Sequence, residues 1–369
     1  MKLLILSSST GGGHDMRARA LLNGWNDHGH EGCISRPLDD GFLAYRMGAE
    51  FYNFIQVKMP WFHQFYFRFL EYANLHRRAS TILGTSRFQQ QVRNFCPDLV
   101  LSVHAHLNHG FFDLVSKASS KPLKSIIYCG ELADGPGFSR HWVNPKVDLF
   151  VGPTSETCEA AVKRGMSREK VKNCGLLLRS PFYAKLDECK RVSCLKDLKI
   201  DSAQPFLLLA TGANGANRHL EICRRLAEAR INIPVVALCG NDLGLKRKLT
   251  EFDQNQGLRV LALPKMGGEQ MFHLLHSALC MVGRPGAGLT SEALACGTPM
   301  VFDLSCGVMP QESNNLNFWK SRGEGVLTMN DPNLLPNVLG QKIPRIRIEL
   351  PSSPSELILL LEALGSRDD

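Results

Sequence analysis

The chain has 369 residues, of which 44% are hydrophobic and 21% charged, and its formal net charge is +8. This composition is typical of a globular protein, and no stretch approaches the ~20 apolar residues that a transmembrane helix needs. The 12 cysteines include no Cys-x-x-Cys pair, which argues against a zinc site and a secreted disulfide framework. The apolar run Met1–Ser9 lacks a basic leader, so we expect a buried strand there and not a signal peptide.

Short apolar runs alternate with amphipathic stretches along almost the whole chain. The predicted strands are Leu3–Leu6, Leu99–Val103, Ser125–Tyr128, Leu149–Val151, Phe206–Ala210, Val235–Cys239, Val260–Leu263, Cys280–Val282 and Met300–Phe302. The predicted helices among them are Glu156–Arg164, Arg218–Ala229, Gly268–His276 and Thr290–Cys296. Nearly continuous apolar strands separated by helices indicate parallel sheets that are covered on both faces.

Two such series, one beginning at Leu3 and one at Phe206, predict an α/β protein with two Rossmann-like domains. We place the first domain at residues 1–180 and the second at residues 181–350, with the link near Ser180–Ala203. Residues 351–369 contain a last predicted helix, Ser355–Leu364, capped by Ser352 or Ser353, which we expect to pack back toward the first domain.

A glycine-rich loop follows the first predicted strand. Gly11, Gly12 and Gly13 let the backbone approach a ligand closely, and the start of the helix predicted at Met16–Asn26 favours an anion. The loop has neither the lysine of a Walker A motif nor the spacing of a dinucleotide fingerprint. His14 lies where ligands bind in open α/β folds, and its ordinary pKa near 6.5 suits a general base. The alternative is a histidine that only fixes the turn.

The segment Phe51–Leu70 differs from the rest of the chain, because it holds 9 of the 29 aromatic residues, interleaved with Lys58, His63 and Arg68. Pro60 interrupts it. Aromatic rings mixed with cations are typical of a membrane interface, although a core helix remains an alternative. Residues 1–180 also hold 22 Lys and Arg against 15 Asp and Glu, which favours an anionic partner or a solvated face.

Two more loops follow strands in the second half. Gly212, Asn214 and Gly215 come directly after a predicted strand and form either an anion cradle or a simple tight turn. The stretch Gly283–Pro299 contains a glycine loop and a helix start predicted at Leu289–Thr290. Glu292 in that helix either caps it or offers a carboxylate to sugar hydroxyls.

A cluster of amides and one acid, Pro310–Asn317, begins the next predicted helix. Amide side chains provide both donors and acceptors, as a polyhydroxylated ligand requires. An ordinary polar helix start explains the cluster equally well.

Together these residues resemble glycosyltransferase family 28, which includes the MurG-type N-acetylglucosaminyltransferases, plant monogalactosyldiacylglycerol synthases and bacterial processive diacylglycerol glucosyltransferases. Gly283–Pro299, followed by Gln311, Glu312 and Asn315, is similar to the donor-site signature of that family. Ser9–His14 resembles the N-terminal loop of the synthases, and Cys174–Phe182 the end of the first domain of the family. Tyr52–Tyr66 is similar to the acceptor region of the diacylglycerol glucosyltransferases.

The resemblance implies a GT-B fold with the active site between the domains, His14 as the catalytic base and a UDP-sugar in the second domain. It implies that the backbone at Lys265–Met266 meets the base, that Glu292 binds the ribose, and that Gln311 and Glu312 meet the sugar. The full implied donor set is Gly212, Asn214, Gly215, Lys265, Met266, Arg284, Gly286, Thr290, Glu292, Gln311, Glu312 and Asn315.

The chain departs from the family in two places. Thr-Asp usually follows the strand at Ser125–Tyr128, whereas here Cys129 and Gly130 precede Glu131, with Asp134 farther on. Glu131 or Asp134 must then replace that aspartate near the acceptor. Arg284 stands where lysine is common, which retains the cation.

The expected function is inverting transfer of a hexose from a UDP-sugar to a lipid acceptor such as diacylglycerol. No Asp-x-Asp triplet is present, so we expect activity in chelator, with no metal and no cofactor. The expected partners are the UDP-sugar, the lipid and an anionic membrane surface, without nucleic acid, for a cytoplasmic protein bound peripherally to the membrane. The alternatives are a UDP-sugar epimerase and a non-catalytic binding protein of the same fold.

Overall fold

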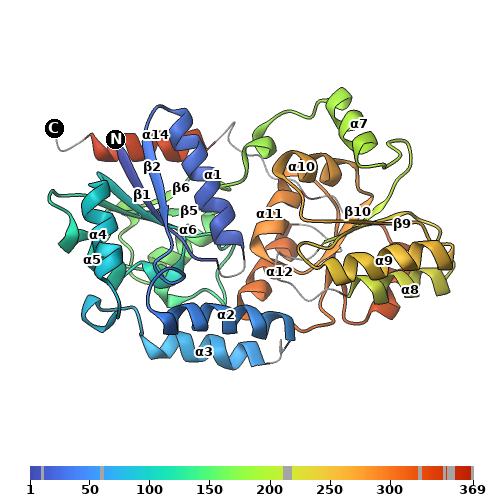
Figure 1. The fold of residues 1–369 in the computed structure, drawn as a ribbon, viewed down its shortest axis with the longest axis horizontal. Helices are drawn as coiled ribbons and strands as arrows, with labels where there is room; N and C mark the ends of the chain where they lie inside the picture. Colours follow the sequence, from blue (N-terminus) through green and yellow to red (C-terminus); the bar gives the residue numbers. More distant parts are fainter. Residues whose placement is uncertain are drawn as a thin grey trace.

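Two six-stranded parallel sheets organise the chain into an N-terminal lobe and a C-terminal lobe (Figure 1). The computed structural model describes residues 1–9, 12–58, 62–210, 218–322, 326–343, 346 and 354–366. Helices cover both faces of each sheet, as the apolar strands require. The predicted α/β fold with two Rossmann-like units is therefore confirmed.

The sheet of the N-terminal lobe has the strand order β2-β1-β3-β4-β5-β6. Its strands are β1 (Lys2–Leu6), β2 (Glu31–Ser35), β3 (Leu99–Ser102), β4 (Lys124–Tyr128), β5 (Leu149–Gly152) and β6 (Val171–Asn173). The helices of this lobe are α1 (Gly13–Asp27), α2 (Leu43–Lys58), α3 (His63–Ala73), α4 (Ser86–Phe95), α5 (Gly110–Ala118) and α6 (Ser155–Lys163).

The sheet of the C-terminal lobe has the order β12-β11-β10-β7-β8-β9. Its strands are β7 (Leu207–Leu209), β8 (Val235–Leu238), β9 (Val260–Leu263), β10 (Cys280–Gly283), β11 (Met300–Asp303) and β12 (Leu327–Met329). The later helices are α7 (Glu188–Asp197), α8 (His219–Glu228), α9 (Leu243–Gln256), α10 (Gly268–Ser277), α11 (Ala287–Cys296), α12 (Pro310–Arg322), α13 (Leu335–Leu339) and α14 (Ser355–Gly365).

Each of the nine predicted strands corresponds to a strand of the structure, although Val103, Phe206, Ala210 and Cys239 lie just beyond the strand ends, whereas β2, β6 and β12 were missed. The missed strands are short or polar at the edges of their sheets, so they carry no apolar run. The helix predicted from Leu289 begins two residues earlier, at Ala287, and the predicted linker contains the helix α7. The caps proposed at Ser352 and Ser353 lie outside the described residues.

The C-terminal helix α14 packs on the N-terminal lobe, where Leu357, Ile358 and Leu361 join a core with Trp25 of α1. A Cβ on Gly24 would lie 3.0 Å from the side chain of Ile358, so a glycine is needed for this close approach. Figure 1 shows α14 in red beside the blue N-terminal strands, and the chain thus crosses between the lobes twice.

The order of the strands determines where a ligand can bind. Strand order reverses between β1 and β3 in the first sheet and between β7 and β10 in the second. In open parallel sheets, ligands bind at the carboxyl ends of the strands that flank such a reversal. The loops that follow these four strands are therefore where a site is expected.

Candidate active site

The helix starts that follow β1 and β10 face each other across the boundary between the lobes. A Cβ on Gly288 in α11 would lie 3.6 Å from the Cα of Gly13 and 3.9 Å from the terminal methyl carbon of Met16 in α1. The two glycine-rich loops identified from the sequence therefore meet, although Gly13 and Gly288 are 275 residues apart in the chain. Both helix starts can favour negative charge at this point.

The local backbone places His14 at the very start of α1. Gly12 is the N-cap and has φ 72°, a left-handed conformation that favours glycine. The helix begins at Gly13, three residues before the predicted start at Met16, so His14 lies in its first turn. Gly11 lies outside the described residues.

The ring of His14 connects the helix start after β1 to the loop after β3, the two strands between which the strand order of the first sheet reverses. Its Nδ1 lies 2.6 Å from the carbonyl oxygen of Val103, which follows β3. Because a carbonyl only accepts hydrogen bonds, Nδ1 carries the proton and Nε2 keeps a free lone pair. The His14 ring also meets the rings of His104 at 4.6 Å and Trp142 at 6.1 Å, which restrict its orientation.

The pKa of His14 is about 4, well below the ordinary value assumed from the sequence. Burial is the largest cause and the charge of Arg17 the second, while the hydrogen bond to Val103 and the charge of Asp15 raise the pKa in part. The imidazole is therefore neutral at pH 7, and Nε2 is available to accept a proton.

Glu131 and Asp134, the two proposed substitutes for the aspartate of the family, have different surroundings. Glu131 receives a hydrogen bond from Trp142, and its Oε2 is buried without a partner among the described residues. Burial raises the pKa of Glu131 to about 7, against the opposing charge of Arg17. Trp142 thus neighbours both His14 and Glu131 and connects this carboxyl to the proposed base.

Asp134 is instead held by Arg164, whose Nη2 lies 2.6 Å from Oδ1. Burial raises its pKa, but the hydrogen bonds from Arg164 and the Gly135 amide outweigh burial and lower it. Asp134 is therefore ionised and forms a structural ion pair with Arg164. Of the two acids, Glu131 has the geometry to act near His14.

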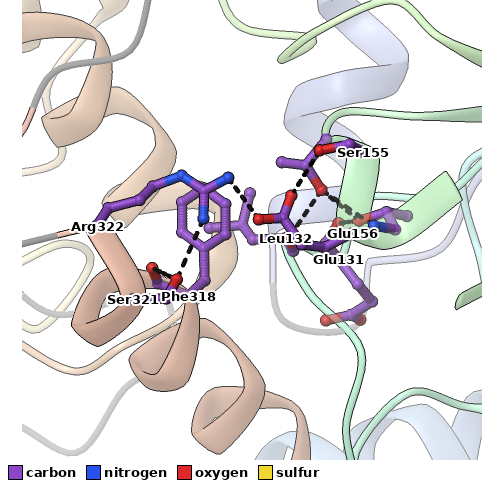
Figure 2. A network of polar contacts seen from close by, with 9 residues as sticks. Glu131, Leu132, Ser155, Glu156, Phe318, Ser321 and Arg322 are labelled. Atoms are coloured by element: carbon purple, nitrogen blue, oxygen red, sulfur yellow. Dashed lines mark hydrogen bonds and ion pairs between the residues drawn. The ribbon is translucent and has the colours of Figure 1, made fainter. Parts of the chain in front are cut away.

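Contacts with the start of α6 fix the backbone around Glu131. The hydroxyl of Thr157 donates to the Glu131 carbonyl oxygen at 2.6 Å, and the hydroxyl of Thr154 donates to that of Leu132 at 2.7 Å. In Figure 2 Glu131 and Leu132 lie at this helix start, close to Ser155 and Glu156. The loop after β4 is thus held firmly to α6.

Arg17, which the sequence analysis did not select, lies between His14 and Glu131. Its side chain is buried, and Nη2 donates to the Gly130 carbonyl oxygen at 3.0 Å. A Cβ on Gly130 would lie 2.4 Å from the guanidinium carbon, so a larger residue at position 130 would displace the arginine. The sequence offered one signal for Arg17: it is a charged residue three positions after His14, and it falls among the buried residues of α1.

On the donor side, Glu292 lies in the second turn of α11 and not in the first, so the suggestion that it caps its own helix is wrong. Both carboxylate oxygens accept hydrogen bonds at 2.7 Å from Arg179, in the segment between the lobes. Arg179 also reaches the carbonyl oxygen of Met266 at 3.5 Å. Burial raises the pKa of Glu292 despite the charge of Arg179.

Arg284 and Glu312 form a second buried ion pair. Nε and Nη2 of Arg284 lie 3.0 Å and 2.6 Å from the two carboxylate oxygens of Glu312, which also accepts from the amide of Met309. Asn315 donates to the carbonyl oxygen of Pro285 at 2.9 Å, and its own Oδ1 is buried without a described partner. The glycine loop after β10 is thus held by the start of α12.

The remaining predicted donor residues are distributed around this loop. Gly286 is the N-cap of α11, and the hydroxyl of Thr290 donates to its carbonyl oxygen at 2.8 Å. Gln311 is half-buried at the start of α12, and Lys265 is exposed beside Met266 after β9. Gly212, Asn214 and Gly215 lie outside the described residues.

A cavity of about 550 Å³ lies between the lobes, beside α3 and the start of α12. Phe67, Glu71 and Tyr72 line it from the N-terminal lobe, and Val308 and Pro310 from the C-terminal lobe. Among the residues that the structure describes, no group of three acidic, histidine or cysteine side chains is arranged to hold a metal ion.

Exposed apolar side chains gather around α2 and α3. Ten of the sixteen large hydrophobic residues that are exposed in the described chain fall between positions 42 and 83. They are Phe42, Leu43, Met47, Phe51, Phe54, Phe65, Phe69, Tyr72, Leu75 and Leu83. Within the described ranges, no helix has the length and apolar character to cross a membrane. Pro60 lies outside the described residues.

Comparison with known sequences connects this chain to lipid glycosyltransferases. Residues 44–178 match the family model of monogalactosyldiacylglycerol (MGDG) synthase. A processive diacylglycerol beta-glucosyltransferase of Bacillus pumilus is 24% identical over 91% of this chain and 85% of that protein. Monogalactosyldiacylglycerol synthase 1 of Arabidopsis thaliana is 25% identical over 88% of this chain but 61% of its own length. The resemblance expected from the sequence is confirmed.

Solved structures show the same architecture. MurG of Acinetobacter baumannii aligns with a TM-score of 0.57 and 12% identity over 98% of this chain and 99% of that one. An Anabaena protein, HepE, in complex with UDP-glucose aligns with a TM-score of 0.54 and 13% identity over 100% and 99%. At such identities the likeness shows the fold alone, which is the expected GT-B fold.

Proposed function

We propose that this chain is a glycosyltransferase that moves a hexose from a UDP-sugar to a lipid acceptor such as diacylglycerol, with inversion and with His14 as the base. The observation that carries the proposal is the hydrogen bond from Nδ1 of His14 to the Val103 carbonyl oxygen. It leaves Nε2 as a proton acceptor where the acceptor lobe meets the start of α11. The names of the matched relatives, which act on diacylglycerol, supply the acceptor class.

The reaction is a single displacement. Nε2 of His14 takes the proton of the acceptor hydroxyl, the hydroxyl oxygen bonds to the anomeric carbon, and the bond from that carbon to the diphosphate oxygen breaks. The electron pair of the broken bond leaves with UDP. Attack from the face opposite the leaving group inverts the anomeric centre, and the proposal includes neither a metal nor a cofactor.

In this proposal Glu131 takes the place of the aspartate that the family resemblance leads one to expect after β4. An ionised Glu131 beside Trp142 stabilises the imidazolium that forms on His14 during attack. Glu292, Gln311 and Glu312 would bind the ribose and the sugar. Glu292 can do so while it keeps Arg179, because each carboxylate oxygen has a second lone pair.

We further propose that α2 and α3 rest on a membrane surface from the cytoplasmic side. Their exposed aromatic and aliphatic side chains stand beside the exposed cations Arg46, Arg68, Arg77 and Arg78. Apolar burial together with cations suits the surface of an anionic bilayer. The cavity beside α3 opens next to this patch, so a lipid headgroup would have a short path to the site. Nucleic acid is not among the proposed partners.

The test of the proposed function is a matrix of UDP-sugars against diacylglycerol vesicles, read as glycolipid formed and UDP released. We expect one UDP-hexose to be used, and His14→Ala to abolish turnover while UDP affinity measured by calorimetry stays within about twofold. A His14→Ala protein with normal turnover would remove the histidine from the role of base. A wild-type protein that binds UDP but forms no product would favour the non-catalytic alternative.

The fold is also compatible with an isomerase activity. UDP-N-acetylglucosamine 2-epimerase of Rickettsia bellii aligns with a TM-score of 0.51 and 13% identity over 100% of this chain and 97% of that one. An epimerase needs no acceptor, so lipid-dependent release of UDP separates the two activities.

A further inference from the structure

The charges around the proposed donor site are unevenly compensated. Arg179 donates two N–H groups to Glu292, and Arg284 donates two to Glu312. Both arginines at the proposed donor site are therefore paired with a carboxylate. Arg17 makes no ion pair with any residue that the structure describes, although it is 6% exposed. A buried cation that has no carboxylate at ion-pair distance is costly, so an anionic ligand is its natural complement.

Two glycines border the buried guanidinium of Arg17. Nη1 would be 3.6 Å from a Cβ on Gly13, and the guanidinium also lies against Gly130. Gly13 in turn faces Gly288 at the start of α11. The guanidinium therefore lies beside the point where the two lobes meet, within reach of a group bound at that helix start.

The electrostatic influence of Arg17 extends into both lobes. Its charge opposes the rise that burial causes in the pKa of Glu131, in the N-terminal lobe, and in the pKa of Glu292, in the C-terminal lobe. Arg17 is thus near enough to the donor lobe to act on charge that develops there.

We infer that Arg17 binds the diphosphate of the nucleotide-sugar donor, as the contribution of the acceptor lobe to the leaving-group site. The inference rests on the proposed function and adds a residue to it. As the bond between the anomeric carbon and the diphosphate oxygen breaks, the electron pair stays on that oxygen, and Arg17 donates N–H groups to the growing negative charge. Arg284, the cation of the glycine loop after β10, is already neutralised by Glu312.

The test compares Arg17→Gln, Arg17→Lys and a control on the same helix, Arg19→Gln. Arg19 carries the same charge but is exposed and paired with Asp15. For each protein we would measure thermal stability, the affinities for UDP and for uridine by calorimetry without lipid, and kcat/KM with the UDP-sugar. Uridine lacks phosphates, so it reports any general damage to the nucleoside site.

We expect Arg17→Gln to lose roughly 10–100-fold in UDP affinity and 100–1,000-fold in kcat/KM, with uridine affinity unchanged. Arg17→Lys keeps the charge but not the fork of donors, so at least a fivefold loss of UDP affinity is expected, and Arg19→Gln should match the wild type. A pH profile adds a second readout. Loss of Arg17 raises the pKa of His14 and Glu131 and moves the acid limb of kcat/KM to higher pH.

The inference is overturned if a folded Arg17→Gln binds UDP like the wild type, or, where that variant fails to fold, if Arg17→Lys does so. An Arg17→Gln protein with unchanged UDP affinity but weaker binding to phosphatidylglycerol vesicles would also overturn the inference, since Arg17 would then bind the phosphate of a lipid. If the wild type binds no UDP at all, the proposed function itself is wrong, and not only the assignment of Arg17 to the diphosphate.

Discussion

At the scale of single residues, the proposed base has an unusual protonation behaviour. The pKa of His14 lies near 4 and that of Glu131 near 7, so the group with the pKa closer to neutrality is the carboxyl that shares Trp142 with the histidine. His14 is neutral at any pH where the protein is expected to work. The pH dependence of activity should then follow Glu131, which must be ionised to support the imidazolium.

This leads to a prediction about the acid limb of the pH profile. The pKa of Glu131 is raised, so the carboxyl is protonated below about pH 7 and ionised above it. We expect kcat/KM to rise as pH increases through about 7, and Glu131→Gln to remove that limb and lower the plateau by roughly tenfold. Steady-state kinetics from pH 5 to 9 would show this.

Asp134→Asn is the matched control, because Asp134 is the other acid proposed for the same role and is paired with Arg164. It should leave the limb in place. A wild-type profile that is flat between pH 5 and 8, or a limb lost in Asp134→Asn, would contradict the assignment to Glu131.

The residues found from the sequence and those missed differ in one respect. His14, Glu292, Arg284 and Glu312 lie in or near glycine-rich loops after strands, and such loops are recognisable locally. Arg179 was missed because its meaning depends on Glu292, 113 residues away in the chain. No local pattern shows which distant carboxylate a given arginine will meet.

At the scale of elements, apolar runs predicted the central strands, but β2 and β12 were missed because tertiary pairing and not hydrophobicity defines them. The segment at α2 and α3 shows the reverse case. Its aromatic content was compatible with a core helix or a membrane surface, and the structure leaves Phe65 and Phe69 more than half exposed. Such a patch on a monomer indicates an interaction surface.

The second prediction concerns that surface. Phe65→Asp with Phe69→Asp should weaken binding to anionic vesicles by at least about tenfold, since each exposed ring would lose ~1.5 kcal/mol or more of burial in the bilayer. Vesicle sedimentation measures the loss, and thermal stability should not fall because both side chains face solvent.

Leu243→Asp is the control for this experiment, because Leu243 is 76% exposed on α9 of the C-terminal lobe, away from α2 and α3. Equal vesicle binding by the double variant and the wild type would rule out this patch as the membrane contact.

At the scale of the whole molecule, a small number of polar contacts connects the lobes. Figure 2 shows Arg322 at the end of α12 lying over the ring of Phe318 and reaching Glu156 at the start of α6. The amide of Gly137 also donates to Asn314 of α12 at 3.3 Å. The sequence predicted two units, but their relative placement depends on contacts between distant residues, including the apolar packing of Leu132 and Ala133 in the core of the C-terminal lobe, and had no local signal.

The third prediction is that the Arg322–Glu156 pair holds the lobes together in this closed arrangement. The two charged atoms are 2.6 Å apart, and both side chains are roughly a third exposed, so the pair contributes about 1 kcal/mol that salt weakens. Arg322→Gln should raise the KM for the donor severalfold and increase the radius of gyration measured by X-ray scattering. Arg168→Gln, which breaks an ion pair with Glu159 inside the N-terminal lobe, should change neither quantity. If Arg322→Gln leaves both values at those of the wild type in low and high salt, other contacts between the lobes, such as that of Asn314, must set their closure.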